Sequence, residues 1–253
     1  MPATFLFYYL RVLLLPYFFM SFLKLANRSL GMIFCLAAFG ISNADTLKTH
    51  SPVPAAVIWQ LDDPAKIGGH TTEVLGAPRV VAEQGAKALV FNGRSDGVFV
   101  PVNPVAGWAQ FTIEVLIKPD GTGDEEQRFM HIQDKDEHRI MIETRVTKDR
   151  HWALDTFLFA STEHSRPLLD KTLLHPTDQW HWVALVYDGK KMANYVNGVK
   201  ELEGEVVVPP MADGRMSIGV RQNKVFWYKG AIREVRYHPV ALSPSSLQRV
   251  EVK

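Results

Sequence analysis

WHWVALVYDGKKMANYVNG at residues 180–198, MSIGV at 216–220 and GAIREVRYHPVALSPSSL at 230–247 together decide the fold of this chain. Two short β-type runs, 181–187 and 191–196, flank the pair Asp188-Gly189, and the pair Asn197-Gly198 follows the second run. Asp-Gly and Asn-Gly pairs adopt the positive φ angles that tight hairpins require. The stretch therefore predicts consecutive antiparallel hairpins.

The rest of the region 57–237 continues this pattern of short apolar or alternating runs separated by Gly, Pro, Asn and Asp. No long stretch has helical periodicity, so the pattern is typical of a sandwich or barrel. A short helical turn is predicted after Ser243, which can cap it, because Pro244 suits the first helical position. The predicted strands are 57–61, 87–91, 97–102, 111–118, 128–133, 139–146, 151–159, 182–187, 192–196, 216–220 and 231–237.

Alternation along these strands assigns side chains to faces, because neighbouring residues of a strand point to opposite sides of the sheet. In the run 128–133, Met130 and Ile132 are expected to oppose Phe129, His131 and Gln133. In the run 139–146, the apolar side chains are Ile140 and Ile142, and they oppose Arg139, Met141, Glu143 and Arg145. If the two strands pair, one sheet face carries a polar patch.

The first 44 residues contain no Asp or Glu and are rich in Leu, Phe, Ile and Tyr, which separates them from the rest of the chain. Read from Met20, they contain the basic residues Lys24 and Arg28, an apolar run at 30–41 and the small-residue sequence Ser42-Asn43-Ala44. This is the order of parts in a secretory signal peptide.

We therefore expect a signal peptide at 1–44, with Met20 as an alternative translation start, a flexible leader at 45–54 and one domain at 55–253. Export to the periplasm or secretion follows from this division. The alternative is an uncleaved membrane anchor that keeps the domain tethered, which is the only case in which we expect membrane contact.

Charge and cysteine content exclude some partners and some means of stabilisation. Without the first 44 residues the chain has 25 basic and 27 acidic side chains, which argues against nucleic acid as a partner. Cys35, the only cysteine of the chain, lies in the predicted signal peptide. The domain must therefore be stabilised by its core, without disulfides or thiolate-bound metal.

Several segments, in their order and spacing, carry a family resemblance: ALVFNGRSDGVFVP at 88–101, FTIEVLIKP at 111–119, WHWVALVYDG at 180–189 with YVNG at 195–198, and GAIREVRY at 230–237 followed by ALS at 241–243. They resemble the laminin-G-like, concanavalin A-like lectin/glucanase jelly rolls of exported bacterial proteins. The resemblance implies an all-β, two-sheet antiparallel jelly-roll sandwich. It leaves the activity open, because this architecture hosts lectins, enzymes and adhesion modules.

The resemblance also bears on calcium. Many members of this family have an acidic residue after the Ile of the closing strand, where this chain has Arg233. A guanidinium cannot coordinate calcium, which takes oxygen ligands, so no cofactor is expected, although Asp62, Asp63 and Asp96 could still contribute to a site. Solvated turn carboxylates are the simpler interpretation of these residues, and Arg233 is expected either to bulge outward or to pair with an acid.

No catalytic or metal site is assigned. The Glu-x-Asp-x-x-Glu strand motif of one glucanase branch is absent, and the run 134–138 lacks the Gly and bidentate Glu of an EF-hand loop. A lyase would combine Tyr or His with charge-neutralising Arg, Gln or Asn. The residues that would supply such a set are His131, Gln133, Arg139, Arg145 and Tyr228, although their order does not match lyase motifs.

We predict an exported, non-catalytic carbohydrate-binding or interaction domain whose partner is a glycan or another envelope or extracellular protein. Two alternatives stay open, a polysaccharide-cleaving lyase or glycoside hydrolase that uses the same sheet face and a structural envelope module. If the polar patch has no binding function, it is an ordinary hydrated sheet face. The predicted ligand-binding residues are His131, Gln133, Arg139, Glu143 and Arg145, with Trp227 and Tyr228 at the edge.

Overall fold

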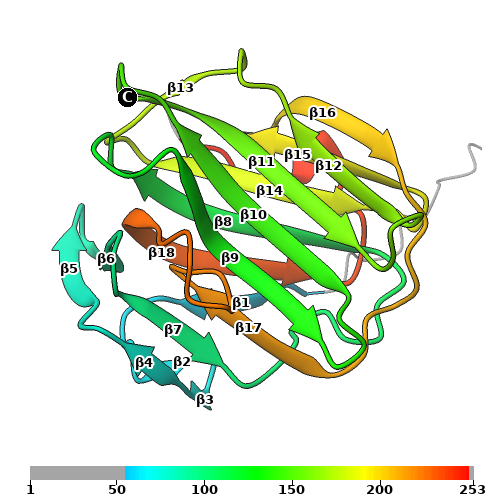
Figure 1. The fold of residues 1–253 in the computed structure, drawn as a ribbon, viewed down its shortest axis with the longest axis horizontal. Coiled ribbons are helices and arrows are strands. Elements are labelled where there is room, and N and C mark those ends of the chain that lie inside the picture. Colours follow the sequence, from blue (N-terminus) through cyan, green and yellow to red (C-terminus); the bar gives the residue numbers. More distant parts are fainter. Residues whose placement is uncertain (1–54, 251–253) are drawn as a thin grey trace, which may run out of the picture. The chain divides into compact units, whose positions relative to one another are not determined.

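The computed structural model describes residues 55–250, which form two antiparallel β-sheets packed face to face (Figure 1). The predicted signal peptide at 1–44 and leader at 45–54 lie outside the described residues. The first sheet has the order β16 (Val199–Glu205), β15 (Lys191–Val196), β14 (His181–Tyr187), β8 (Phe111–Pro119), β18 (Lys229–His238), β6 (Ala86–Asn92) and β5 (Arg79–Glu83), and β1 (Val57–Gln60) pairs with β18.

The second sheet has the order β12 (Ser165–Leu169), β11 (His151–Phe159), β10 (Arg139–Val146), β9 (Glu126–Asp134), β17 (Gly214–Ile218), β7 (Gly97–Val100) and β4 (Glu73–Leu75), and β13 (His175–Pro176) pairs with β11. A small ribbon consists of β2 (Lys66–Ile67) and β3 (His70–Thr71). The expected two-sheet sandwich is confirmed, and each predicted strand forms with ends that differ by at most two residues. Within the described residues, no helix has the length and apolar character needed to cross a bilayer.

The strands that the sequence did not predict are mostly short or lie at sheet edges. β16 and β12 are examples, with the sequences VKELEGE and SRPLL. Charged residues and Pro are common on edge strands because they oppose pairing with another chain, and they hide the alternation that marks a central strand. The predicted helical turn is a 3₁₀ turn at Pro244–Ser246, but Ser243 does not cap it through its side chain as expected.

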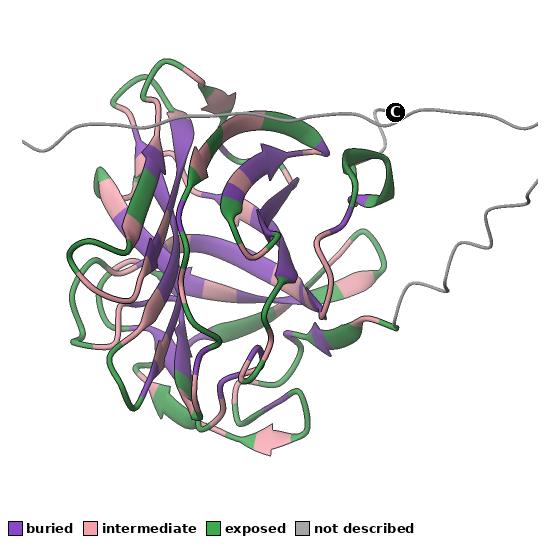
Figure 2. Ribbon diagram, turned by 90° about the vertical axis from the view of Figure 1, so that its right-hand side faces the viewer, coloured by how far each residue is buried: buried purple, intermediate pink, exposed green. Residues whose placement is uncertain are grey.

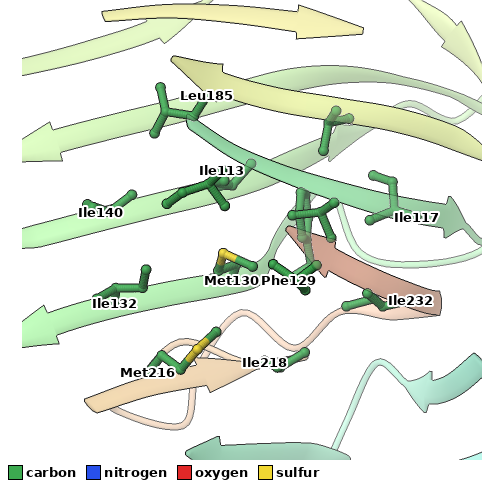
Figure 3. Packing of buried hydrophobic residues seen from close by; sticks show 14 of the residues in the cluster. Ile113, Ile117, Phe129, Met130, Ile132, Ile140, Leu185, Met216, Ile218 and Ile232 are labelled. Atoms are coloured by element: carbon green, nitrogen blue, oxygen red, sulfur yellow. The ribbon is translucent and has the colours of Figure 1, made fainter. Parts of the chain in front are cut away.

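The core lies between the two sheets, where buried residues gather on the facing strands (Figure 2). Figure 3 shows Ile132 and Ile140 of the second sheet packed with Ile113 and Leu185 of the first. These four side chains are fully buried, and each such burial contributes about 1.5–3 kcal/mol relative to exposure. The core therefore holds the two sheets together without disulfide bonds.

A bulge in β9 changes which residues face this core. Met130 pairs with Ile142 and Arg128 with Glu143, so Phe129 has no partner on β10. The extra residue turns Phe129 inward, where it is fully buried. The expectation that Phe129 points away from the core is therefore wrong, because simple alternation does not hold across a bulge.

The outer surface of the first sheet is covered in part by the chain segment after β18. Leu242 and Leu247 of this segment pack on Ala184, Val186 and Tyr195. In this part of the first sheet, apolar side chains are therefore buried on both the inner and the outer surface. The outer surface of the second sheet carries the polar side chains instead.

Candidate functional site

The strand register places the five predicted strand residues on one surface, the outer side of β9, β10 and β11. Arg139 pairs with Gln133 and Phe159, and Met141 pairs with His131. Further along the same strands, Glu143 pairs with Arg128 and Asp155, and Arg145 pairs with Glu126. We call this surface the polar face, defined by Glu126, Arg128, His131, Gln133, Arg139, Met141, Glu143, Arg145, Asp155, Phe157 and Phe159.

One end of the polar face is a network of ions centred on Arg145. Its guanidinium contacts three carboxylates, Glu126 at 2.5 Å, Glu143 at 3.2 Å and Asp155 through Nε at 2.8 Å. The side chain of Arg145 is only 12% exposed. Arg145 therefore neutralises neighbouring carboxylates and presents little free donor capacity to a ligand, so its predicted ligand-binding role has little support from these contacts.

Glu143 lies inside this network and is 2% exposed. Burial, followed by the charge of Asp155, raises the pKa of Glu143 to about 7, against the opposing effect of Arg128 and Arg145. Burial likewise raises the pKa of Asp155. The pair therefore combines a carboxyl group that holds its proton up to neutral pH with a second carboxyl that is hydrogen-bonded to Arg145.

His131 occupies the other end of the polar face and is 2% exposed. Its Nδ1 accepts a hydrogen bond of 3.2 Å from the backbone N–H of Gln222, so in the neutral ring the proton is on Nε2. Burial lowers the pKa of His131 to about 3, and the charges of Arg221, Arg139, Arg128 and Arg215 contribute in that order. The ring is therefore a neutral donor among guanidinium groups.

The two predicted edge aromatics lie in different surroundings. Tyr228 is fully buried in the core and its hydroxyl donates to the carbonyl of Ala231 at 3.4 Å. The prediction that Tyr228 lies at the edge of the face is therefore wrong, because its ring fills space between the sheets beside Phe91 and Phe129. Trp227 is half-buried and lies beside Gly97 at the start of β7.

Other aromatic rings flank the polar face. Phe157 and Phe159 are half-buried neighbours on β11, with ring centroids 5.9 Å apart. The guanidinium of Arg139 lies 4.2 Å from the Phe159 ring centroid. That of Arg128 lies 3.8 Å from Phe226, which belongs to the segment between β17 and β18. These rings give the face apolar surface next to its hydrogen-bond donors.

Three hollows lie along this surface. One of about 220 Å³ is lined by Arg128, Met141, Glu143, Arg145, Asp155, Phe157 and Pro167. A second, of about 570 Å³, lies beyond Gln133 and is lined by Pro101, Gln133, Asp134, Lys135, Gly214, Arg215, Gln222 and Asn223. A third, of about 510 Å³, includes Arg145, Ala153 and the loop 121–125. Each of the three hollows includes at least one residue of the polar face.

The residues considered for calcium have other roles. Arg233 is the bulge residue of β18, lies 4.3 Å from the ring centroid of Trp180 and donates to the Glu83 carbonyl at 3.0 Å. Asp96 is buried rather than solvated, and its carboxylate accepts from the backbone N–H groups of Ala77 and Asn92. Across residues 55–250 no group of three or more His, Cys, Asp or Glu side chains is arranged to hold a metal ion.

Several members of the polar face are not among the residues predicted from the sequence. Asp155, Phe157 and Phe159 lie two residues apart along β11 and therefore share one face of the strand. This alternation could have assigned them to the polar face if β11 had been placed beside β10. Arg221 and Phe226 had no such signal, because they lie in an irregular segment whose position depends on the tertiary fold.

A family model described as the concanavalin A-like lectin/glucanases superfamily matches residues 92–248. Domain 4 of AbnA, an extracellular GH43 arabinanase from Geobacillus stearothermophilus solved in complex with arabinotriose, is similar in structure, with a TM-score of 0.56 and 22% identity over 75% of this chain and 94% of that chain.

Two further solved structures share the fold at low identity. The ligand binding domain of botulinum neurotoxin serotype D in complex with N-acetylneuraminic acid has a TM-score of 0.53 and 15% identity, covering 75% of this chain and 48% of that chain. The binding domain of Paraclostridial Mosquitocidal Protein 1 has a TM-score of 0.54 and 16% identity, covering 75% and 50%. The chain thus spans about half the length of these two domains. A comparison with curated protein sequences finds no match.

Proposed function

This chain belongs to the concanavalin A-like lectin/glucanase superfamily, and from that premise we propose that it is a non-catalytic carbohydrate-binding domain whose ligand lies on the polar face. The observation that carries the proposal is the composition of that face. Guanidinium and amide donors alternate there with the half-buried rings of Phe157 and Phe159. Sugars offer hydroxyl groups to such donors and apolar C–H faces to aromatic rings.

Relatives of the same fold support this choice of ligand class. Domain 4 of AbnA was solved with arabinotriose and the serotype D neurotoxin domain with N-acetylneuraminic acid. For this chain, Gln133, Arg139 and the edge near Trp227 are proposed ligand contacts. His131 and Glu143 are proposed to act from beneath, because both are almost fully buried.

A polysaccharide-cleaving enzyme is the second candidate, and one observation favours it. Glu143, with its pKa raised to about 7, lies across the strand pair from Asp155, and a glycoside hydrolase needs one protonated and one ionised carboxyl group. The side chains are 2% and 8% exposed, and both contact Arg145. This burial favours binding over cleavage, because substrate must reach a catalytic acid directly.

A glycan array followed by calorimetric titration of each hit tests the binding proposal on the purified protein. We expect binding to at least one oligosaccharide and no release of reducing ends or unsaturated uronates. Gln133→Ala or Phe159→Ala should weaken binding, whereas Thr71→Ala, on the separate β2–β3 ribbon, should not. Product release would support the enzyme, and a complete absence of glycan binding would leave a structural or protein-binding module of the envelope.

Export from the cell belongs to the same proposal, because the predicted signal peptide at 1–44 would deliver the domain to extracellular glycans. N-terminal sequencing of the protein recovered outside the cytoplasm tests this. We expect the sequence to begin at Asp45. Recovery of a chain that starts at Met1 or Met20 would instead support the membrane anchor.

A further inference from the structure

The positive charges of the polar face are unevenly matched by acids. The carboxylates of Glu126, Glu143 and Asp155 all contact Arg145 at one end of the face. Arg128 shares two of these partners, at 2.8 Å from Glu126 and 2.9 Å from Glu143. At the other end, Arg139, Arg215 and Arg221 form no ion pair with any residue in the described part of the chain.

These unpaired guanidinium groups converge on His131. Arg139 and Arg215 each lie on a strand next to β9 and pair with Gln133, two residues from His131. Arg221 precedes Gln222, whose backbone N–H binds the His131 ring. Burial lowers the pKa of Arg221, and the charges of Arg128 and Arg139 lower it further. Guanidinium groups therefore repel one another here, and an anion between them would relieve the repulsion.

Two buried N–H donors at this end lack an acceptor. Within residues 55–250, neither Nε2 of His131 nor Nε of Arg139 has a hydrogen-bond partner. The Nδ1 of His131 is already bonded to Gln222, which fixes the proton on Nε2 as described above. A buried donor without an acceptor destabilises the folded protein, so both groups favour a ligand that brings acceptor oxygens without donors.

We propose that the His131 end of the polar face binds the carboxylate or sulfate group of an acidic sugar. Arg139 and Arg221 pair with the anion. The Nε2–H of His131 is buried in the free protein, so it donates to one of the anion's oxygens only after the side chains that cover it move aside. Planar guanidinium groups suit the oxygens of carboxylate and sulfate. The proposal rests on the glycan-binding function above and names the ligand class of that site.

The surroundings leave room for the rest of such a sugar chain. The hollow of about 570 Å³ adjoins this end through Gln133, Arg215 and Gln222, and it also contains Lys135. The carboxylate of Asp134, its acidic lining residue, is already engaged by His138 and by backbone N–H groups. The Phe159 ring borders the opposite side through its contact with Arg139.

Matched pairs of ligands test the proposal by calorimetry. Oligogalacturonate is compared with its methyl ester, which removes the carboxylate charge, and heparin oligosaccharides with their desulfated forms. We expect one of the acidic ligands to bind at least tenfold more tightly than its neutral partner, and the affinity to fall with salt. The first pair reports on carboxylates and the second on sulfates.

Arg139→Gln and Arg221→Gln, each expected to weaken the acidic ligand at least tenfold, locate the site. Neither arginine is fully buried, and a thermal melt verifies that each variant is folded. Arg79→Gln, an exposed arginine on β5 of the other sheet, is the matched control and should bind as the parent does.

Nuclear magnetic resonance of the uniformly ¹⁵N-labelled protein gives a second readout. Binding of the acidic ligand should shift the Nε2 resonance of His131 while the ring stays neutral. Equal affinity for acidic and neutral partners would overturn the acidic-sugar proposal but leave the glycan-binding function standing. Failure of every glycan to bind would overturn both, and full affinity in both arginine variants would overturn the assigned site.

Discussion

Arg145 has a structural role at the scale of the single residue. It contacts Glu126, Glu143 and Asp155, two of which are almost fully buried. Arg145→Ala would leave buried carboxylates without their partner, which costs about 3–5 kcal/mol. Lys171→Ala removes an exposed pair with Glu125 and should leave the free energy of unfolding nearly unchanged, because water screens exposed ion pairs. Urea denaturation of both variants measures the difference, and equal losses would contradict the structural role.

His131 makes the stability of the domain depend on pH. Its pKa is lowered from 6.5 to about 3, so the unfolded chain takes up the proton first as the pH falls. The stability contributed by the neutral ring is present above pH 6.5 and is progressively lost below it. Between pH 7 and pH 4.5 we expect a loss of about 3 kcal/mol from this group.

Urea denaturation at the two pH values, on the parent and on His131→Gln, isolates this contribution. The variant should lose less free energy of unfolding than the parent on acidification, because the other titrating groups are the same in both. Glu143 acts in the opposite sense, since its raised pKa gives stability below about pH 4.5 that is lost as the pH rises through 7. An identical pH dependence in parent and variant would contradict the buried neutral histidine.

At the scale of the element, the bulge in β9 decides which of two phenylalanines supports the fold. Phe129 lies in the core because it is the extra residue, whereas Phe157 lies half-buried on the outer surface of β11. Phe129→Ala should cost about 3–5 kcal/mol, and Phe157→Ala about 1 kcal/mol. Thermal and urea unfolding test the contrast.

Phe129→Leu keeps most of the volume and should cost under about 2 kcal/mol, so a measurement remains possible if the alanine variant does not fold. A larger loss for Phe157→Ala than for Phe129→Ala would show that β9 alternates without a bulge.

The strands and turns differ in how well the sequence predicts them. Asp188-Gly189 predicted the hairpin of β14 and β15, and Asn197-Gly198 predicted the turn that follows β15, because turn chemistry is local. Alternation placed Arg139, Glu143 and Arg145 on one face because β10 is regular. It failed at Phe129, since a bulge depends on the segment after β17, whose Phe226 carbonyl accepts the backbone N–H of Arg128.

Residues from irregular segments were beyond such reasoning. Tyr228 follows Trp227 in a stretch that reads as a turn, yet it lies in the core immediately before β18, where its backbone N–H donates to the Gly219 carbonyl. Arg221 reaches His131 only through the tertiary path of the chain. The polar face was thus predictable where strands supply it and unpredictable where loops do.

At the scale of the whole molecule, the part matched by the family model is smaller than the folded unit. The match begins at residue 92, but β1, β5 and β6 belong to the first sheet. Trp59, Leu61, Leu89 and Phe91 lie before or at this boundary and are buried in the core. We expect the fragment 55–253 to unfold cooperatively and the fragment 92–248 not to fold.

Near-ultraviolet circular dichroism during thermal unfolding distinguishes the two fragments. The longer one should show a single sharp transition with fixed aromatic signals, and the shorter one should show neither. Cooperative unfolding of the shorter fragment would mean that the strands before residue 92 are dispensable.

The segment between β17 and β18 lies against the His131 end of the polar face, where we propose that an acidic sugar binds. It holds Lys224 and Phe226 at φ of 61° and 57°, a region that L-residues seldom occupy. The segment is fastened through the Gln222 contact to His131 and the Phe226 contact to Arg128, both anchored on β9. Val220 and Tyr228 near its ends are fully buried, so only the exposed residues 223–225, between these two contacts, can be exchanged without disturbing the two-layer scaffold. Substitutions at these three positions would alter the surface beside the proposed anion site while the segment keeps its contacts with β9.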